Sequence, residues 1–449
     1  MSKQRIQLSD HFTYSRLLRF VLPCIGTMLF TSIYGIVDGL CVSNFVGKTA
    51  FAAVNLIMPL PMLLGTIGFM LGTGGSAIVG ITLGEGDQKK ADRYFTLFLL
   101  AALVSVSVLA VLGIVFLRPI AVLLGAKGEL LDYAVRYGRI LMVSLPTFAL
   151  QNMFQSFFVT AEKPHLGFWF TVGAGCTNMV LDVLMVGIWG WGVEGAAIAT
   201  FISQLVGGVL PVFYFIDRSN SSRLHLCKTS FYSKVLRDAC INGSSELMTN
   251  LSMSLVNILY NYQLLRLAGE NGVAAYGVIM YAAFLFVAVF VGYAVGSAPI
   301  VSFHYGARNH AEVHNLYRKS LRLIAVVAVT LTLASMFIIP CVARIFVGYD
   351  AELLALTSRA FRLYAPSFLI MGFNVYASSF FTALGDGVTS ALISFLRTLA
   401  FQVIAILLLP LLLGIDGIWL AVTAAELAAL AVSAAMLLTK DKVFHYRKV

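Results

Sequence analysis

The chain has 449 residues and a net charge of +10, with 59% hydrophobic and 12% charged residues. A soluble domain carries about 25% charged residues, so this composition excludes an ordinary soluble enzyme and indicates a polytopic membrane protein. The positive charge requires no nucleic acid partner, because basic residues that flank membrane spans already face anionic lipid. The basic N-terminus lacks a small-residue cleavage site, so we expect no cleaved signal peptide.

Apolar runs of bilayer-spanning length follow one another along the whole chain. Backbone amides in lipid must be bonded within their own segment, so each run predicts a transmembrane helix, and no alternating pattern supports an outer-membrane barrel. We therefore expect an all-α polytopic membrane protein with twelve transmembrane helices, which cover residues 17–40, 52–83, 95–117, 133–158, 166–189, 193–216, 238–265, 272–303, 320–343, 360–384, 388–413 and 417–438.

The loops between these spans set the expected orientation. Most of the 31 lysines and arginines lie at the N-terminus, in residues 84–94, at Lys163, in residues 217–237 and 307–322, and in the C-terminal tail. All of these segments fall on one side of the membrane if the number of spans is even. The excess of basic residues in cytoplasmic loops then predicts that both termini are cytoplasmic.

An internal repeat links the two halves of the sequence. Residues 47–58 (GKTAFAAVNLIM) align with residues 269–280 (GENGVAAYGVIM), and the same register places residues 152–161 over residues 374–383 without a gap. A chance match would not hold one register over so many residues, so the chain is expected to contain two equivalent units.

The repeat predicts two parallel six-helix lobes. Residues 1–216 form the N-lobe with helices one to six, residues 238–449 form the C-lobe with helices seven to twelve, and residues 217–237 form a cytoplasmic loop between them. Parallel repeats of this kind are common in secondary transporters, which place the substrate path between the lobes. The alternative is a gene duplication without moving parts.

The stretch CTNMVLDVLMVGIWGWGVEGAAIAT (176–200) places a carboxylate, Asp182, inside an apolar span. A charge at the bilayer centre costs roughly 2.5 to 3.5 kcal/mol, which indicates a function. Asn178 lies one turn earlier on the same helix face, Thr200 reaches a similar depth in the next span, and Asp38 lies in the first. These oxygen ligands suit a small cation, and without a metal ion the paired acids form a proton site. The alternative is that both acids only cap helices.

The Asn-x-x-x-Asp pattern of the fifth span, the threonine of the sixth, the aspartate of the first and the six-plus-six layout resemble the multidrug and toxic compound extrusion (MATE) transporters. The segments GDQKKADRYF and WGVEGAAIAT also fit this family, and the resemblance covers nearly the whole chain. It implies alternating-access export coupled to Na⁺ or H⁺, with the cation held by residues matching Asp38, Asn178, Asp182 and Thr200 and by the backbone carbonyl of Ala196.

The resemblance also implies what the protein binds and where it lies. We expect a monomeric antiporter for organic cations in the inner or plasma membrane, in contact with lipid, without cofactor, nucleic acid or enzymatic activity. Glu246 matches a glutamate that many members carry near the cavity of the second lobe. The tenth span departs from some relatives because it offers Asn374 and no carboxylate, so Glu246 faces either a second cation or a cationic substrate.

Aromatic, methionine and small polar residues suit binding of amphipathic cations between the lobes. The candidates, besides Glu246, are Tyr34, Tyr137, Phe154, Gln155, Asn250, Met280 and Tyr281. Two further charges lie deep in the last two spans, and we expect a structural salt bridge between them, from Arg397 to Glu426.

Several other signals have simpler explanations. GTGGS (72–76) lacks the lysine of a phosphate-binding loop, and its small residues favour close helix packing. His310 and His314 (HAEVH) do not match a zinc-protease helix. A lipid-linked precursor flippase of the same superfamily remains an alternative, although it would need more basic charge in the spans. A membrane-embedded transferase would need an acid or histidine cluster at a loop.

Overall fold

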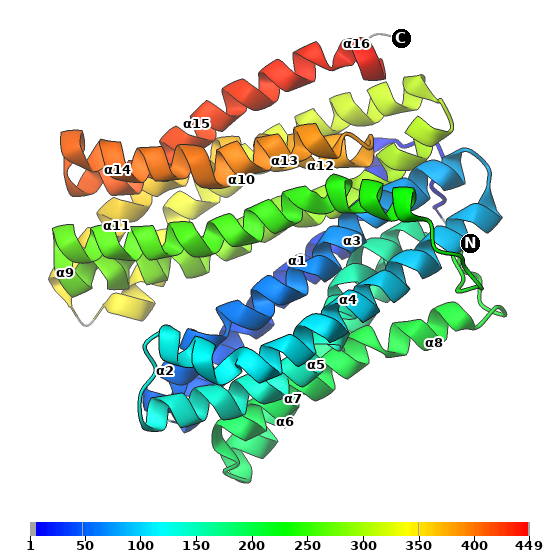
Figure 1. Cartoon of the computed structure of the whole chain (residues 1–449). Helices are drawn as coiled ribbons and strands as arrows, with labels where there is room; N and C mark the ends of the chain where they lie inside the picture. The colour runs from blue at the N-terminus through cyan, green and yellow to red at the C-terminus, as the bar shows by residue number, and fades with distance from the viewer. Residues whose placement is uncertain (1–5, 47, 349, 448–449) are drawn as a thin grey trace.

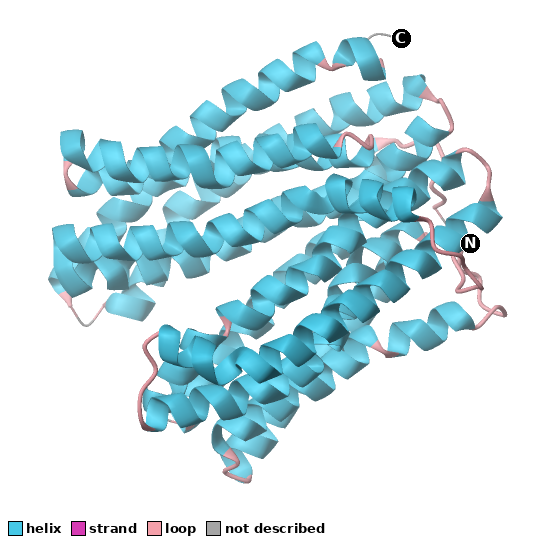
Figure 2. Ribbon diagram, in the orientation of Figure 1, coloured by secondary structure: helices cyan, strands magenta, loops and turns pink. Residues whose placement is uncertain are grey.

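A computed structural model describes residues 6–46, 48–348 and 350–447, except for the side chains at positions 36, 38–44, 48, 51, 339–340, 342 and 345–346. The described residues form helices and loops without a strand (Figure 2). The helices are α1 (Tyr14–Phe45), α2 (Lys48–Ile57), α3 (Pro59–Gly84), α4 (Gln88–Leu123), α5 (Glu129–Thr160), α6 (Pro164–Leu181), η1 (Asp182–Ile188), α7 (Gly192–Gly208), α8 (Leu210–Ile216), α9 (Ser233–Gly306), α10 (His310–Val347), α11 (Ala351–Tyr364), η2 (Ala365–Ser367), α12 (Phe368–Ala383), α13 (Gly387–Phe395), η3 (Leu396–Ala400), α14 (Phe401–Leu413), α15 (Ile415–Thr439) and α16 (Asp441–Phe444).

Each of the twelve expected spans is helical. Nine helical stretches among the described residues are long and apolar enough to cross a membrane. The remaining spans are α5, the segment formed by α11, η2 and α12, and a second span within α9, which is long enough for two. Gly269 joins these two spans with φ of 61° and ψ of −151°. A positive φ carries no steric cost for glycine, so the chain turns back here.

The helices gather in two groups that run through the molecule in the same general direction. Figure 1 shows α2 and α4 to α8 on one side and α10 to α16 on the other, with both termini at the same end. We call α1 to α8 the first half and α9 to α16 the second half. Helices α1 and α3 of the first half contact α9 of the second, so these three helices form the junction.

Small residues bring α3 and α9 together at this junction. A Cβ atom on Gly74 would lie 2.2 Å from the backbone oxygen of Ala239, and one on Gly243 would lie 1.9 Å from that of Met70. Asn242 of α9 donates a hydrogen bond of 3.4 Å to the backbone oxygen of Gly74. The glycines of the GTGGS stretch therefore serve helix packing, which confirms the expectation from the sequence.

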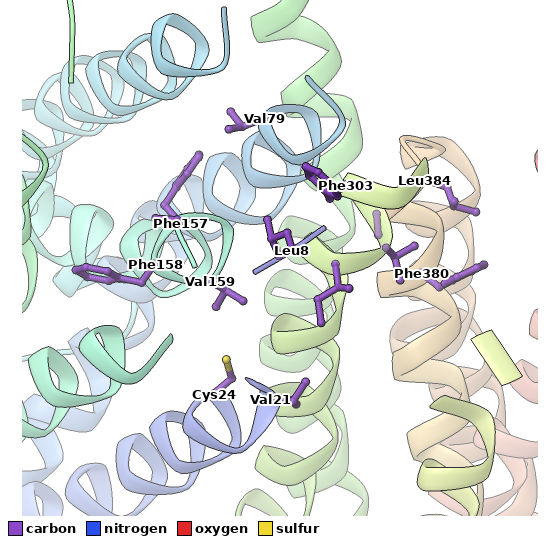
Figure 3. Packing of buried hydrophobic residues seen from close by; sticks show 14 of the residues in the cluster. Leu8, Val21, Cys24, Val79, Phe157, Phe158, Val159, Phe303, Phe380 and Leu384 are labelled. Atoms are coloured by element: carbon purple, nitrogen blue, oxygen red, sulfur yellow. The ribbon is translucent and has the colours of Figure 1, made fainter. Parts of the chain in front are cut away.

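The segment before α1 bridges the two halves at the end that carries the termini. The amide of Leu8 donates to Glu162 of the first half at 2.9 Å, and the amide of Phe12 donates to Glu312 of the second at 2.8 Å. Leu8 and Phe12 are fully buried in an apolar cluster that includes Val159 and Phe303, from opposite halves. Figure 3 shows Leu8 with Val159 and Phe303 in this cluster. This segment therefore ties the halves together at this end.

Residues 217–237, expected as a loop, pack along α4. The amide of His225 donates to Asp92 at 3.0 Å, and the amide of Cys227 donates to Thr96 at 3.1 Å. Helix α9 already begins at Ser233, inside the expected loop. The connection between the halves is thus held against the first half by hydrogen bonds. The exact boundaries of the two lobes stay a prediction.

Candidate functional site

Asp182 lies where helix α6 changes to the π-helical segment η1. It is fully buried, and its backbone amide donates to the carbonyl of Asn178 one turn earlier. The side chain of Asn178 is 2% exposed, and its amide nitrogen makes no hydrogen bond within the described part of the chain. The π-helix is a rare conformation. The structure therefore places Asp182 at the start of an irregular end of this span, with Asn178 one turn before it in regular helix.

Thr200 and Ala196 lie on α7, which contacts both α6 and η1. The hydroxyl of Thr200 donates to the backbone carbonyl of Ala196 at 3.0 Å, and Ala196 is 1% exposed. Inside α7 this carbonyl also accepts the helical hydrogen bond from the amide of Thr200, so a cation would take the place of the Thr200 hydroxyl on its second lone pair. The predicted residues of α6, η1 and α7 thus come from helices that pack together.

Helix α1 completes this group of helices. Gly175 of α6 lets it approach, because a Cβ atom at this position would lie 2.5 Å from the ring of Phe30 and 3.1 Å from that of Tyr34. The backbone of Asp38 belongs to α1, but its side chain lies outside the described residues. The expected role of Asp38 as a cation ligand therefore stays a prediction.

A cavity of about 290 Å³ lies mainly among helices of the second half. Its lining includes Glu246 and Met280, two of the predicted substrate residues, and both charged residues expected to pair, Arg397 and Glu426. Hydroxyl and amide side chains add polarity: Ser245, Thr249, Asn257, Tyr260, Tyr276, Tyr364, Ser394, Thr398 and Gln402. The lining thus combines apolar side chains with many polar groups, and a concave site with both kinds of surface is suited to a small molecule.

The salt bridge predicted from the sequence is present in this cavity. Nε of Arg397 donates to the two carboxylate oxygens of Glu426 at 2.8 and 3.1 Å. Asn374 donates to the same carboxylate at 2.7 Å and to the backbone oxygen of Glu426 at 2.9 Å. Asn374, expected only as a polar residue of the tenth span, thus holds Glu426 in place.

The other predicted substrate residues lie elsewhere. Tyr137 is 1% exposed, with its hydroxyl 3.8 Å from the sulfur of Met58. Phe154 stacks on Phe215 in a buried aromatic cluster of the first half. Gln155 lines a small separate pocket, Asn250 donates to the backbone oxygen of Glu246, Tyr34 packs near Phe30, and Tyr281 is 44% exposed. None of these residues is among the lining of the described cavity.

The three tyrosines that line the cavity, Tyr260, Tyr276 and Tyr364, were not expected from the sequence. The rings of Tyr260 and Tyr276 stack with centroids 4.9 Å apart, and the hydroxyl of Tyr276 donates to Asn257 at 2.7 Å. The internal repeat could have pointed to Tyr260. The register that places residues 47–58 over 269–280 also places Asp38, a predicted site residue, over Tyr260. The equivalent position in the second half thus carries an aromatic residue of a cavity.

Comparisons with known proteins agree with this architecture. The MatE family model matches residues 23–184 and again residues 247–408, which together make up more than half of the chain. Two similar curated proteins are both called "Multidrug export protein MepA". The one from Staphylococcus saprophyticus is 21% identical over 436 residues, covering 96% of this chain and 95% of the relative. The one from Staphylococcus aureus (strain MSSA476) is 22% identical over 433 residues, with the same coverage.

A solved structure described as "Outward-facing conformation of a multidrug resistance MATE family transporter of the MOP superfamily" also resembles this chain. The TM-score is 0.92 at 22% sequence identity, and the match covers 99% of both chains. A likeness at this identity shows the fold, which is therefore the all-helical, polytopic membrane fold expected from the sequence.

Proposed function

We propose that this chain, which belongs to the MatE family, is a multidrug exporter that expels organic cations in exchange for Na⁺ or H⁺. As a member of a transporter family it is not an enzyme. The relatives named multidrug export proteins support the cargo class, since they match the chain over nearly its whole length. We further propose that it works as a monomer, with both termini cytoplasmic and the lobes 1–216 and 238–449 as the moving bodies.

The observation that carries the coupling step is the complete burial of Asp182 beside Asn178. A carboxylate is expensive in the membrane, so a cation that neutralises it stabilises the conformation in which the site is closed. Asn178 contributes an amide oxygen, and Thr200 and Ala196 contribute further oxygens from the neighbouring helix. Either Na⁺ or a proton can neutralise this carboxylate, and the transport experiment below identifies the ion.

Alternating access follows if cation binding and substrate binding favour different arrangements of the two halves. A ligand shifts a conformational equilibrium only through its different affinity for the two states. Binding of the coupling ion at Asp182 from outside would favour the state that has released the drug. The return requires loss of the ion inside and binding of a new substrate molecule.

The test is efflux of ethidium from loaded cells and uptake into inverted vesicles, with Na⁺ and pH gradients imposed separately. We expect wild type to transport under one gradient and Asp182→Asn to lose that transport, while Glu352→Gln, an exposed acid on α11, retains it. The gradient that drives transport identifies the ion. Transport by Asp182→Asn at the wild-type rate would remove Asp182 from the coupling step, and no transport by wild type under either gradient would contradict the antiporter.

A further inference from the structure

Arg397 lies in the cavity of the second half, where a receptor for cations has no obvious use for a positive charge. Its guanidinium contacts Glu426 through Nε alone. Among the described residues, the hydrogen bonds of the Arg397 side chain all come from Nε and none from its terminal nitrogens. Arg397 lines the cavity, and 14% of its side chain is exposed. A guanidinium has five N–H donors in a fixed fork, so most of them remain for a ligand.

The cavity also contains buried polar groups that lack partners. The hydroxyl of Tyr260, on a residue 2% exposed, and Oε1 of Gln402, on a residue 9% exposed, have no hydrogen-bond partner among the described residues. A buried polar group without a partner is unfavourable, so such groups point to a polar ligand. The cavity is therefore suited to a molecule with hydrogen-bonding groups as well as apolar surface.

The charged residues of the cavity determine which net charge on a ligand the cavity can bind. Its charged lining residues are Glu246, Glu426 and Arg397, which leaves one net negative charge when all three are ionised. Arg397 and Glu426 form a pair, so Glu246 is the carboxylate that a ligand cation can neutralise. A ligand with one positive charge balances the site, whereas an added negative charge would leave it unbalanced.

The helices set the difference in level between the backbone positions of Glu246 and Arg397. A Cβ atom on Gly387 would lie 2.3 Å from Cα of Asn242, so these residues mark a common level on α13 and α9. Counting the rise of 1.5 Å per residue from that level along both helices places Arg397 about 9 Å beyond Glu246. A molecule that carries its charge and its acceptor on substituents at opposite ends of an aromatic ring has the length that this offset requires.

We propose that this cavity selects organic cations that carry a hydrogen-bond acceptor, such as a carbonyl oxygen, at the end opposite to the positive charge. Glu246 holds the cationic end, and the terminal nitrogens of Arg397 hold the acceptor. Glu426 positions the guanidinium because it accepts from Nε, and Asn374 holds the Glu426 carboxylate in place. This inference rests on the proposed function and names the substrate class more narrowly.

The test compares two probes of nearly the same shape, para-acetylbenzyltrimethylammonium and para-isopropenylbenzyltrimethylammonium. They differ in a carbonyl oxygen that the second replaces by a methylene group. We expect purified wild type in nanodiscs to bind the acetyl probe about tenfold more tightly, which is modest for one hydrogen bond from a charged donor. Isothermal titration without any ion gradient measures both dissociation constants.

The double variant Arg397→Gln/Glu426→Gln removes the fork and preserves the net charge of the cavity. We expect it to bind both probes equally and to bind the isopropenyl probe as wild type does. Glu246→Gln weakens both probes by the same factor, and Arg362→Gln, on the exposed face of α11, changes neither. If the double variant does not fold, Arg397→Lys keeps the charge but carries all its donors on one nitrogen, which pairs with Glu426 and does not reach the acceptor, so it too should lose the preference.

The outcomes separate this inference from the proposed function. Equal binding of the two probes by wild type, or a preference that survives in the double variant, overturns the role of Arg397 and leaves organic cation export standing. Binding of neither probe by wild type contradicts the organic cation class itself and the inference with it. A preference lost only when Arg397 is changed supports the proposal.

Discussion

Nε of Arg397 lies 2.8 and 3.1 Å from the two carboxylate oxygens of Glu426, and the carboxylate side chain is 2% exposed. The residues come from η3 and α15, which are separated in sequence and adjacent in the fold. Desolvation of two charges is costly, so this pair adds little stability compared with two apolar residues, but loss of one partner leaves the other buried and uncompensated.

Glu426→Met should therefore lower the free energy of unfolding by about 3 to 5 kcal/mol, and Arg397→Met by a similar amount. The double variant Arg397→Met/Glu426→Met should be more stable than either single one. Unfolding of the purified protein in mixed micelles measures the cycle. The exposed pair of Arg359 and Asp416 is the control, with an expected coupling of about 0 to 1 kcal/mol. Equal coupling in the two pairs would refute the prediction.

The crossing of α3 and α9 predicts opposite effects for two glycines of the same helix. Gly243→Ala would bring a Cβ atom 1.9 Å from the backbone oxygen of Met70, whereas a Cβ atom on Gly277 meets nothing within 4 Å. We expect Gly243→Ala to destabilise the protein by about 1 to 3 kcal/mol or more, because the helices must separate. Gly277→Ala should be neutral or stabilising by up to about 1 kcal/mol. Equal unfolding temperatures for the two variants would contradict the close approach of α3 and α9 at Gly243.

Glu312 anchors the segment before α1. Its carboxylate accepts hydrogen bonds from the amide of Phe12 at 2.8 Å and from Asn315 at 2.8 Å, and it lies 2.6 Å from Nδ1 of His11. Glu312→Ala should speed hydrogen exchange at the amide of Phe12 by at least about tenfold, since local opening no longer breaks these bonds. Glu85→Ala, an exposed acid after α3, is the control. Unchanged exchange at Phe12 would show that other contacts hold the segment.

The carboxyl of Asp386 lies outside the spans, and its contacts predict that the stability of the fold depends on pH. Burial raises the pKa of this carboxyl, but the hydrogen bonds from Lys440 and Thr389 outweigh burial and lower the pKa below its usual 3.8. A lowered pKa in the folded state stabilises the fold above the usual pKa, and this contribution disappears as the pH falls through the folded-state value. Asp386→Asn keeps a residue able to cap α13 and removes the charge.

The unfolding temperature of Asp386→Asn should therefore lie below that of wild type at neutral pH, and the difference should shrink as the pH falls below about 4. Differential scanning fluorimetry across this range measures both proteins. Asp217→Asn offers a comparison in the exposed loop, where the hydrogen bonds from Ser219 lower the pKa of that carboxyl. A difference at Asp386 that is constant with pH would show that its charge is not involved.

Much of the site could be predicted from the sequence because its charged residues lie in otherwise apolar spans. Asp182, Arg397 and Glu426 are charged groups inside apolar spans, and such groups require partners. This reasoning led to the salt bridge, which is confirmed, and to the family resemblance, which is also confirmed. The substrate residues had no such signal. Aromatic side chains are common in every span, so Tyr137 and Phe154, which the structure buries in packed clusters, could not be distinguished from Tyr260 and Tyr276.

The sequence by itself determined the twelve helical spans and the charged residues within them, because length and hydropathy depend only on local composition. Only the tertiary structure decided which helices touch. The bridging by Leu8 and Phe12 and the cavity around Glu246 arise from contacts between residues far apart in the chain. Hydropathy separates lipid from water, but a helix packed against lipid and one packed against another helix are equally apolar, so packing alone selects the neighbours.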